Sequence, residues 1–365
     1  MEQWGAPGNR HGSSGIGDLP GTWLEVLLQE LRFWAGQLRK NGERCPVETV
    51  FVGGGTPSLL EPDQIGRLLA AVRENFCLAD DAEVTMEANP DSLHTADRAR
   101  GFLEAGINRI SLGVQSLDDT ELRFLGRLHS SDAARRAVHA LRQAGCTNLN
   151  IDLIWGLPGQ TPEQWRRVLH NAVALEPDHV SAYGLSIEPG TPLERKNVTL
   201  PDDDVLAAMF MDGGEILEQA GLCQYEISNY ARQGFRCRHN LGYWHGQEYL
   251  GLGPAAVSTV DGIRWTNPSD MEEWAQQVRS GRRSSDREYL TSGVRGKEMI
   301  MLGLRTVDGL PLGLYQKETE RDFLCEHGAF VAELLGHGLA VLEDGHLKLT
   351  REGMLVSNGI IEHFF

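Results

Sequence analysis

A glycine-rich turn directly follows a short apolar run near the start of the chain. The run Val50 to Val52 is suited to a buried strand, and it continues into Gly53, Gly54, Gly55 and Thr56. A strand that ends in bare backbone lets peptide N–H and C=O groups approach a ligand closely. Such a turn suits a charged, zwitterionic or phosphorylated small molecule, although an ordinary tight turn uses the same residue types.

Polar side chains recur where later predicted strands end. Glu87 ends one strand, Gln115 follows the next, Arg127 lies twelve residues further on, and Asp152 sits within an otherwise apolar strand. A carboxylate at a strand end can accept two hydrogen bonds from a ribose diol. An acid in an apolar strand is costly unless it faces a polar cavity. Capping, surface exposure or a local backbone bond could explain each residue singly, but the set indicates a binding site.

A second cluster, between residues 236 and 245, combines histidine with aromatic side chains. His239 lies within a few residues of Tyr243 and Trp244. An imidazole beside flat aromatic surface suits a planar macrocycle such as haem. The alternative is a hydrogen-bonded histidine in a packed loop. Cys237 does not belong to a C-x-x-C-H motif, so covalent haem attachment is not predicted.

Short apolar strands alternate with amphipathic helices over the first half of the chain. The predicted strands are 49–52, 83–87, 109–113, 148–154 and 179–185. The predicted helices are 22–40, 62–75, 96–105, 118–125, 132–144 and 162–175. This alternation predicts an α/β fold with parallel strands. Polar residues at the carboxyl ends of the strands favour a partial (β/α) barrel over an open sheet, because barrel active sites form there.

The first predicted helix has no strand before it. A parallel unit that lacks its leading strand leaves the strand 49–52 with an unpaired edge. We therefore predict a barrel, over residues 22–200, that lacks its first strand. Residues 1–21 contain six glycines and little apolar periodicity, which predicts a disordered leader.

The strand–helix alternation stops near residue 201. Residues 201–294 form a predicted connecting region with a helix at 202–221, a short strand at 225–228 and a loop at 236–253. In residues 295–365, two helices (296–304 and 321–335), a hairpin (339–342 with 346–349) and a last helix (352–361) predict a winged-helix-like α+β domain. We interpret this domain as a packing or partner surface, with nucleic-acid binding as the alternative.

Composition narrows the classes of function. The chain has 51 acidic and 34 basic residues, a net charge of -17, which argues against a nucleic-acid partner. No eighteen-residue apolar run and no secretory signal are present, so we expect no membrane span and a cytoplasmic protein. The cysteines are isolated, which excludes a local metal knuckle; they are Cys45, Cys77, Cys146, Cys223, Cys237 and Cys325.

Several motifs together carry a family resemblance. They are Gly53-Gly54-Gly55-Thr56-Pro57, Glu87-Ala88-Asn89-Pro90, Arg109 to Ser116, Asn150 to Gly159, and His239-Asn240 with Tyr243-Trp244. Their order and spacing resemble those of the HemW-type haem chaperones. These are radical S-adenosylmethionine proteins related to oxygen-independent coproporphyrinogen III oxidase. The resemblance extends over roughly residues 22–365.

The resemblance implies roles for the residues that match these motifs. Gly54, Gly55 and Thr56 would hold the methionine end of S-adenosylmethionine. The cofactor's remaining contacts would come from Glu87, Gln115, Arg127 and Asp152. The haem signature matches His239, Asn240, Tyr243 and Trp244, with His239 as the candidate iron ligand.

The resemblance also implies a function, which is to bind haem and transfer it to an acceptor protein. One alternative is radical oxidative decarboxylation of coproporphyrinogen III. A third possibility is a cluster-free barrel that binds a nucleoside or a partner.

One family feature is missing. Three cysteines, spaced by three and then two residues, bind a 4Fe-4S cluster in the family, and no such trio occurs in this sequence. A truncated or misread amino terminus and a naturally cluster-free relative both explain the difference.

Overall fold

The structure is a computed structural model that describes residues 22–196, 198–281 and 286–365. The predicted leader at residues 1–21 lies outside this range. None of the described helices combines the length and the apolar character that spanning a bilayer demands.

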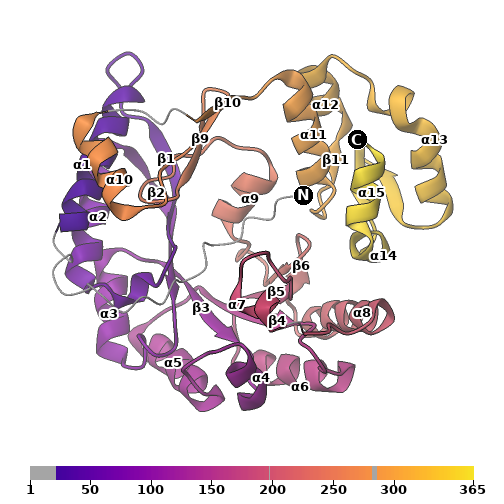
Figure 1. Cartoon of the computed structure of the whole chain (residues 1–365), viewed down its shortest axis with the longest axis horizontal. Helices are drawn as coiled ribbons and strands as arrows, with labels where there is room; N and C mark the ends of the chain where they lie inside the picture. The colour runs from indigo at the N-terminus through magenta and orange to yellow at the C-terminus, as the bar shows by residue number, and fades with distance from the viewer. Residues whose placement is uncertain (1–21, 197, 282–285) are drawn as a thin grey trace.

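A curved seven-stranded sheet forms the centre of the first half of the chain (Figure 1). Its order is β1-β2-β3-β4-β5-β7-β6, and β1 to β5 run parallel, whereas β7 is antiparallel to β5. The strands are β1 (Pro46–Val52), β2 (Cys77–Ala88), β3 (Arg109–Gln115), β4 (Leu149–Trp155), β5 (His179–Gly184), β6 (Cys223–Gln224) and β7 (Asn229–Ala231). Among the described strands β1 pairs only with β2, and the curved, mostly parallel sheet agrees with the predicted partial barrel.

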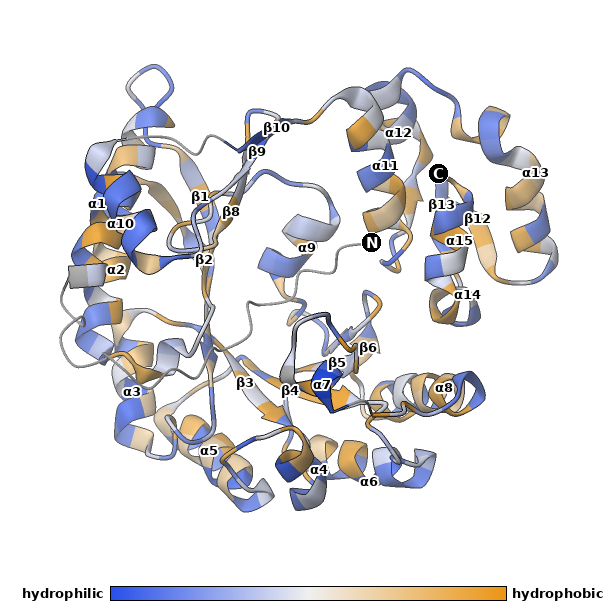
Figure 2. Cartoon of the chain, in the orientation of Figure 1, coloured by the Kyte–Doolittle hydropathy of each residue, from blue (hydrophilic) through white to orange (hydrophobic). Residues whose placement is uncertain are grey.

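Helices cover the convex side of this sheet (Figure 1). They are α1 (Thr22–Gln37), α2 (Pro62–Asn75), α3 (Ala96–Ala105), α4 (Asp119–Phe124), α5 (Ser131–Ala144) and α6 (Pro162–Val173). A 3-10 turn, η1 (Pro57–Leu59), precedes α2, and α7 (Pro192–Arg195) and α8 (Asp203–Gln219) follow β5. These helices show apolar and polar faces (Figure 2), which is why the 3.6-residue period predicted most of them correctly.

Local chemistry sets the helix ends. Ser130 caps α5 by accepting a hydrogen bond from the Ala133 amide, and Gly145 ends the helix in the left-handed region at φ 97°. Thr161 and Gln164 form a capping box at the start of α6. Each such cap contributes about 1 kcal/mol. These signals lie within a few residues of the helix they delimit, so the sequence alone revealed them.

The two faces of the sheet differ in chemistry. On β3, Ile110, Leu112 and Val114 are buried against the helices and belong to the main hydrophobic core. Burying each such side chain stabilises the fold by about 1.5–3 kcal/mol. The alternate residues, Arg109 and Ser111, lie on the concave face instead, because successive side chains of a strand point to opposite sides.

The connecting region differs from the prediction in two places. The predicted strand 225–228 is wrong, because these residues form the turn that joins β6 to β7. The predicted loop 236–253 contains a helix, α9 (Arg238–Trp244). Further elements here are β8 (Val257–Val260), β9 (Ile263–Thr266), α10 (Met271–Ser280) and β10 (Arg287–Tyr289), and the three strands form an antiparallel sheet.

The last 70 or so residues form an α+β unit, as predicted. Its helices are α11 (Ser292–Gly303), α12 (Leu312–Thr319), α13 (Phe323–Gly336), α14 (Arg351–Leu355) and α15 (Ser357–His363). A three-stranded antiparallel sheet joins β11 (Leu310–Pro311), β13 (His346–Leu349) and β12 (Ala340–Glu343). The predicted single helix 352–361 is two helices, α14 and α15. The break lets Met354 and Ile360 both reach the core of this unit.

Candidate functional site

The glycine turn after β1 is open and backbone-lined, as predicted. Gly54 and Gly55 have φ angles of 80° and 64°, and a Cβ atom on either would meet no other atom within 4 Å. The Gly54 amide donates a 2.9 Å hydrogen bond to Oε2 of Glu87 at the end of β2. Bare backbone and a carboxylate therefore meet at the carboxyl ends of two neighbouring strands.

The carboxyl ends of the parallel strands form a rim, which we call the strand-end rim. Three charged side chains, Glu87, Asp152 and Arg127, interact there. Burial raises the pKa of Glu87, the Gly54 hydrogen bond opposes that rise, and the nearby charge of Asp152 adds to it. Burial also raises the pKa of Asp152 and lowers that of Arg127, and the charge of Asp152 partly offsets the fall for Arg127. Asp152 accepts hydrogen bonds from Ser111, at 3.2 Å to Oδ2, and from Asn150, at 2.7 Å to Oδ1. The acid in the apolar strand thus faces a polar interior, as its sequence position required.

Thr56 and Gln115 meet at the same rim through Asn89. The Asn89 amide group donates to Thr56 Oγ1 at 3.1 Å. A Cβ atom on Gly113 would lie 2.9 Å from Gln115 Nε2 and 3.2 Å from Asn89 Oδ1, so both side chains converge over this glycine. Gln115 has a φ of 68°, beside an irregularity in the pairing of β3 with β4. A non-glycine residue in that conformation costs about 1–3 kcal/mol, and such strain gathers at functional sites.

The predicted haem residues lie on α9, which contacts both β1 and α11 on the concave side of the sheet (Figure 1). His239 and Tyr243 are one turn apart, and His239 Nε2 lies 3.0 Å from the Tyr243 hydroxyl. Asn240 and Trp244, also one turn apart, are both half-buried. The structure therefore brings all four residues together on a helix of under two turns, although the sequence predicted a loop.

The ring of His239 is held on three sides. Its Nδ1 lies 2.9 Å from Thr49 Oγ1 on β1, and its ring stacks on Phe51 with centroids 5.0 Å apart. Burial lowers the pKa of His239; the charge of Glu83 opposes this fall and that of Arg109 adds to it. Burial thus favours the neutral imidazole, which is the form that binds a metal.

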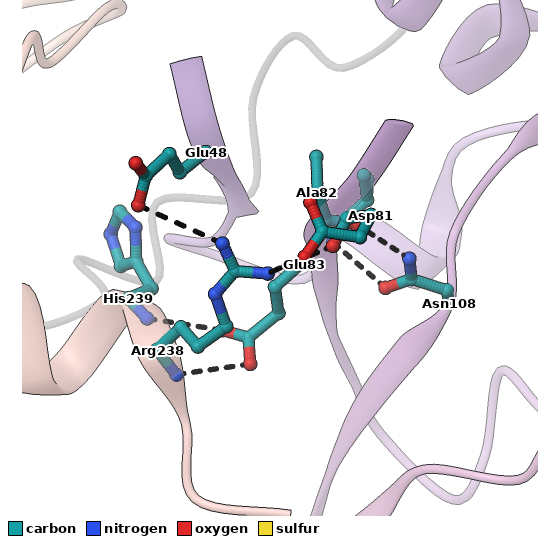
Figure 3. Close-up of polar contacts among 8 residues, drawn as sticks. Glu48, Asp81, Ala82, Glu83, Asn108, Arg238 and His239 are labelled. Carbon is teal, nitrogen blue, oxygen red and sulfur yellow. Dashed lines mark hydrogen bonds and ion pairs between the residues drawn. The ribbon is translucent and has the colours of Figure 1, made fainter. Parts of the chain in front are cut away.

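Glu83 of β2 fastens α9 to the sheet. Its carboxylate accepts hydrogen bonds from the backbone amides of Arg238 at 3.0 Å and His239 at 3.1 Å, and from the thiol of Cys237 at 3.3 Å. Figure 3 shows this carboxylate facing the first amides of the helix. Cys237, at the N-cap position, makes no side-chain cap of its own. A carboxylate from a distant strand thus satisfies amides that would otherwise be unpaired.

Phe51 connects the two groups of predicted residues. Its ring stacks on His239, and a Cβ atom on Gly53 would lie 2.7 Å from that ring and 3.1 Å from the carboxyl carbon of Glu87. The strand-end rim and the α9 histidine therefore lie on either side of one aromatic ring, on the same concave face.

Sequence reasoning missed Thr49, Phe51, Glu83 and Arg109. The signal that could have found them is the two-residue alternation along the strands. On β2, Glu83 and Glu87 alternate with the buried Val84 and Met86. A strand with one apolar and one acidic face indicates a polar interior.

Comparison with known proteins identifies the class of protein to which this fold and site belong. Residues 29–172 match the radical SAM superfamily, and residues 290–356 match the HemN C-terminal domain. In a solved structure, coproporphyrinogen III oxidase (HemN) of Escherichia coli has the same fold. Its TM-score is 0.79 at 24% identity, over 94% of this chain and 83% of that one.

Curated relatives then narrow the class to a family. Heme chaperone HemW of Mycobacterium tuberculosis is 37% identical over 94% of this chain and 86% of its own length. HemW of E. coli is 37% identical over 87% of this chain and 84% of its own length. The mitochondrial radical S-adenosyl methionine domain-containing protein 1 of Danio rerio is 35% identical over 93% of this chain and 79% of its own length. The chain belongs to the HemW family.

The donor sets fit two of the three groups that this family implies. The guanidinium of Arg127 suits the carboxylate of S-adenosylmethionine, and the acceptors at the rim suit an ammonium and a ribose. The neutral imidazole of His239 suits haem iron. A 4Fe-4S cluster does not fit, because the six cysteines are dispersed over the fold and the described residues contain no group of three or more metal-binding side chains.

Proposed function

We propose that this chain is a haem chaperone that binds haem at α9 and passes it to an acceptor protein. The observation that carries the proposal is the half-buried imidazole of His239, held between Phe51 and Tyr243 in a chain of the HemW family. Its aromatic neighbours offer flat apolar surface to a macrocycle.

Iron binding requires one rearrangement at His239. With the ring hydrogen on Nδ1, that atom donates to Thr49, and the Nε2 lone pair accepts from the Tyr243 hydroxyl. The iron would take the place of this hydroxyl at Nε2. Release would let the hydroxyl return to its bond. Competition between iron and hydroxyl for one lone pair keeps haem exchangeable, which is what delivery to an acceptor requires.

The test is a haem titration followed by the Soret band. Purified protein should show a shifted Soret band on adding haem, and His239→Ala should abolish or strongly weaken the shift. His245→Ala is the matched control, since His245 ends the same helix and is exposed. Equal shifts in wild type and His239→Ala would refute the assignment of the iron ligand. Absence of any shift in wild type would refute the function.

We further propose that the strand-end rim binds S-adenosylmethionine. The supporting observation is that Gly54, Glu87, Asp152 and Arg127 converge there through hydrogen bonds and charge. Calorimetry with S-adenosylmethionine should give a binding isotherm that Glu87→Gln weakens about 10-fold or more, as expected for loss of a charged acceptor. Glu104→Gln, on the exposed side of α3, is the control. Equal affinity of the Glu87→Gln variant and wild type would overturn this assignment.

A further inference from the structure

A buried arginine on the concave face is not satisfied by the protein. Arg109 begins β3 and is 2% exposed, and its Nε has no hydrogen-bond partner among the described residues. Its partner in the parallel register of β2 is Thr85, which is 0% exposed. Within the described part of the chain, Thr85 Oγ1 also lacks a hydrogen-bond partner. Two unsatisfied polar atoms therefore lie on directly paired positions of neighbouring strands.

Such a pair calls for an explanation, because leaving a buried donor unpaired is expensive. Two acids on this face are already engaged by other donors. Glu83 accepts from the amides of α9, and Asp152 accepts from Ser111 and Asn150. No ion pair of Arg109 occurs among the residues that the structure describes.

The chemistry of the free groups defines what would satisfy them. A guanidinium presents its N–H donors in a planar fork that matches the two oxygens of a carboxylate. A hydroxyl on the adjacent strand can donate a further hydrogen bond to the same oxygens. Asp152 and Glu226 would oppose an anion when ionised; burial raises the pKa of both, to about 7 for Glu226, while the charge of Arg109 opposes that rise for Asp152.

We propose that Arg109 and Thr85 bind a carboxylate group of a ligand on the concave face of the sheet. Glu83, two residues before Thr85 on the same face of β2, accepts a hydrogen bond from the backbone amide of His239, which places α9 beside this pair of strand positions. Haem carries two propionate carboxylates, so a single haem could present its iron to His239 and a propionate to Arg109. This choice of ligand rests on the proposed haem function, whereas the carboxylate site itself does not. The other source of the same chemistry is a free carboxylate.

Two arms of one experiment separate these sources. In the first, haem and haem dimethyl ester, in which both propionates are esterified, are titrated into wild type, Arg109→Gln and Thr85→Val. Wild type should bind haem about 10-fold or more tightly than the ester, and Arg109→Gln should bind both alike. Thr85→Val should reduce the preference in part. In the second arm, acetate at fixed ionic strength should raise the Tm of wild type more than chloride does, and this difference should vanish in Arg109→Gln.

The outcomes are distinct. A haem preference that Arg109→Gln removes supports the propionate. Equal binding of haem and ester, together with the acetate effect, supports a site for a free carboxylate and overturns the propionate assignment. If wild type shows neither the preference for haem nor the acetate effect, the proposed carboxylate site is overturned. If haem fails to bind at all, the haem function fails, and the acetate arm still tests Arg109.

The folded state of each variant is checked separately. Circular dichroism and thermal melts of each variant establish that it is folded, and Thr85→Val keeps the proposal testable if Arg109→Gln is not. Arg167→Gln, at an exposed arginine on α6, is the matched control and should leave both arms unchanged.

Discussion

Replacing Tyr243 with phenylalanine should tighten haem binding, even though Tyr243 belongs to the predicted haem signature. The hydroxyl of Tyr243 lies 3.0 Å from Nε2 of His239, the atom that would bind the iron. Haem iron bound at this atom would have to displace the Tyr243 hydroxyl. The phenyl ring keeps the edge-on packing that Tyr243 makes with His239 and Tyr249, at centroid distances of 4.8 and 4.6 Å. The substitution therefore removes the competing bond and little else.

The expected size follows from the net value of one hydrogen bond. Such a bond contributes about 0.5–1.5 kcal/mol. Tyr243 is 41% exposed, so water replaces part of the lost bond and the effect falls in the lower half of that range. A gain of about 0.5–1 kcal/mol corresponds to binding about 2- to 5-fold tighter.

The assay is a Soret titration of wild type, Tyr243→Phe and Tyr249→Phe. Tyr249→Phe leaves the bond between His239 and Tyr243 in place and should match wild type. Adding His239→Ala to the Tyr243→Phe background should abolish the gain, because the freed lone pair is then absent. Weaker binding by Tyr243→Phe would refute the reasoning, since it would mean that the hydroxyl contacts haem rather than competing with it.

Three further predictions follow from the same interior. Glu83→Gln should lower the free energy of unfolding by about 1.5–3 kcal/mol in a urea titration, because its carboxylate receives two amides of α9, whereas Glu48→Gln, an exposed partner of Arg238, should cost under about 1 kcal/mol. For Glu226, burial raises the folded-state pKa to about 7. Between about pH 4.5 and 7 the unfolded chain therefore ionises this group while the folded protein does not, which destabilises the fold as pH rises. Stability measured from pH 4 to 8 should show Glu226→Gln gaining on wild type over that window, by on the order of 3 kcal/mol at its upper end; parallel curves would contradict this. Finally, burial lowers the pKa of His239, so protons should displace haem only at a pH clearly below 6.5, and a Soret midpoint at or above 6.5 would be the contrary result.

The sequence was most informative where the physical cause is local. The helix 62–75 was predicted to the residue, because Pro62 at its first position and the amphipathic period lie within it. Glu87 was found because it ends a predicted strand, and Asp152 because it breaks an apolar one. Parallel strands then had to bring them together at one rim, and the structure shows that they do.

Other features depend on the concave face that the curved sheet creates. Arg109 was not singled out, since an arginine at the start of a strand is usually exposed. In the folded protein it is buried on the concave face, paired in register with Thr85. The signature containing His239 was found, but its neutral state depends on Phe51, Thr49 and burial, which no short stretch of sequence contains.

By itself, the sequence determined the alternating strands and helices, the open glycine turn and the motifs of the HemW family. Tertiary structure alone decided that residues 238–244 are a helix. This segment lacks an N-cap of its own, and its first amides are satisfied by Glu83, more than 150 residues earlier. The reason is physical: unpaired amides at a helix start need an acceptor, and here the fold supplies one that the neighbouring sequence does not.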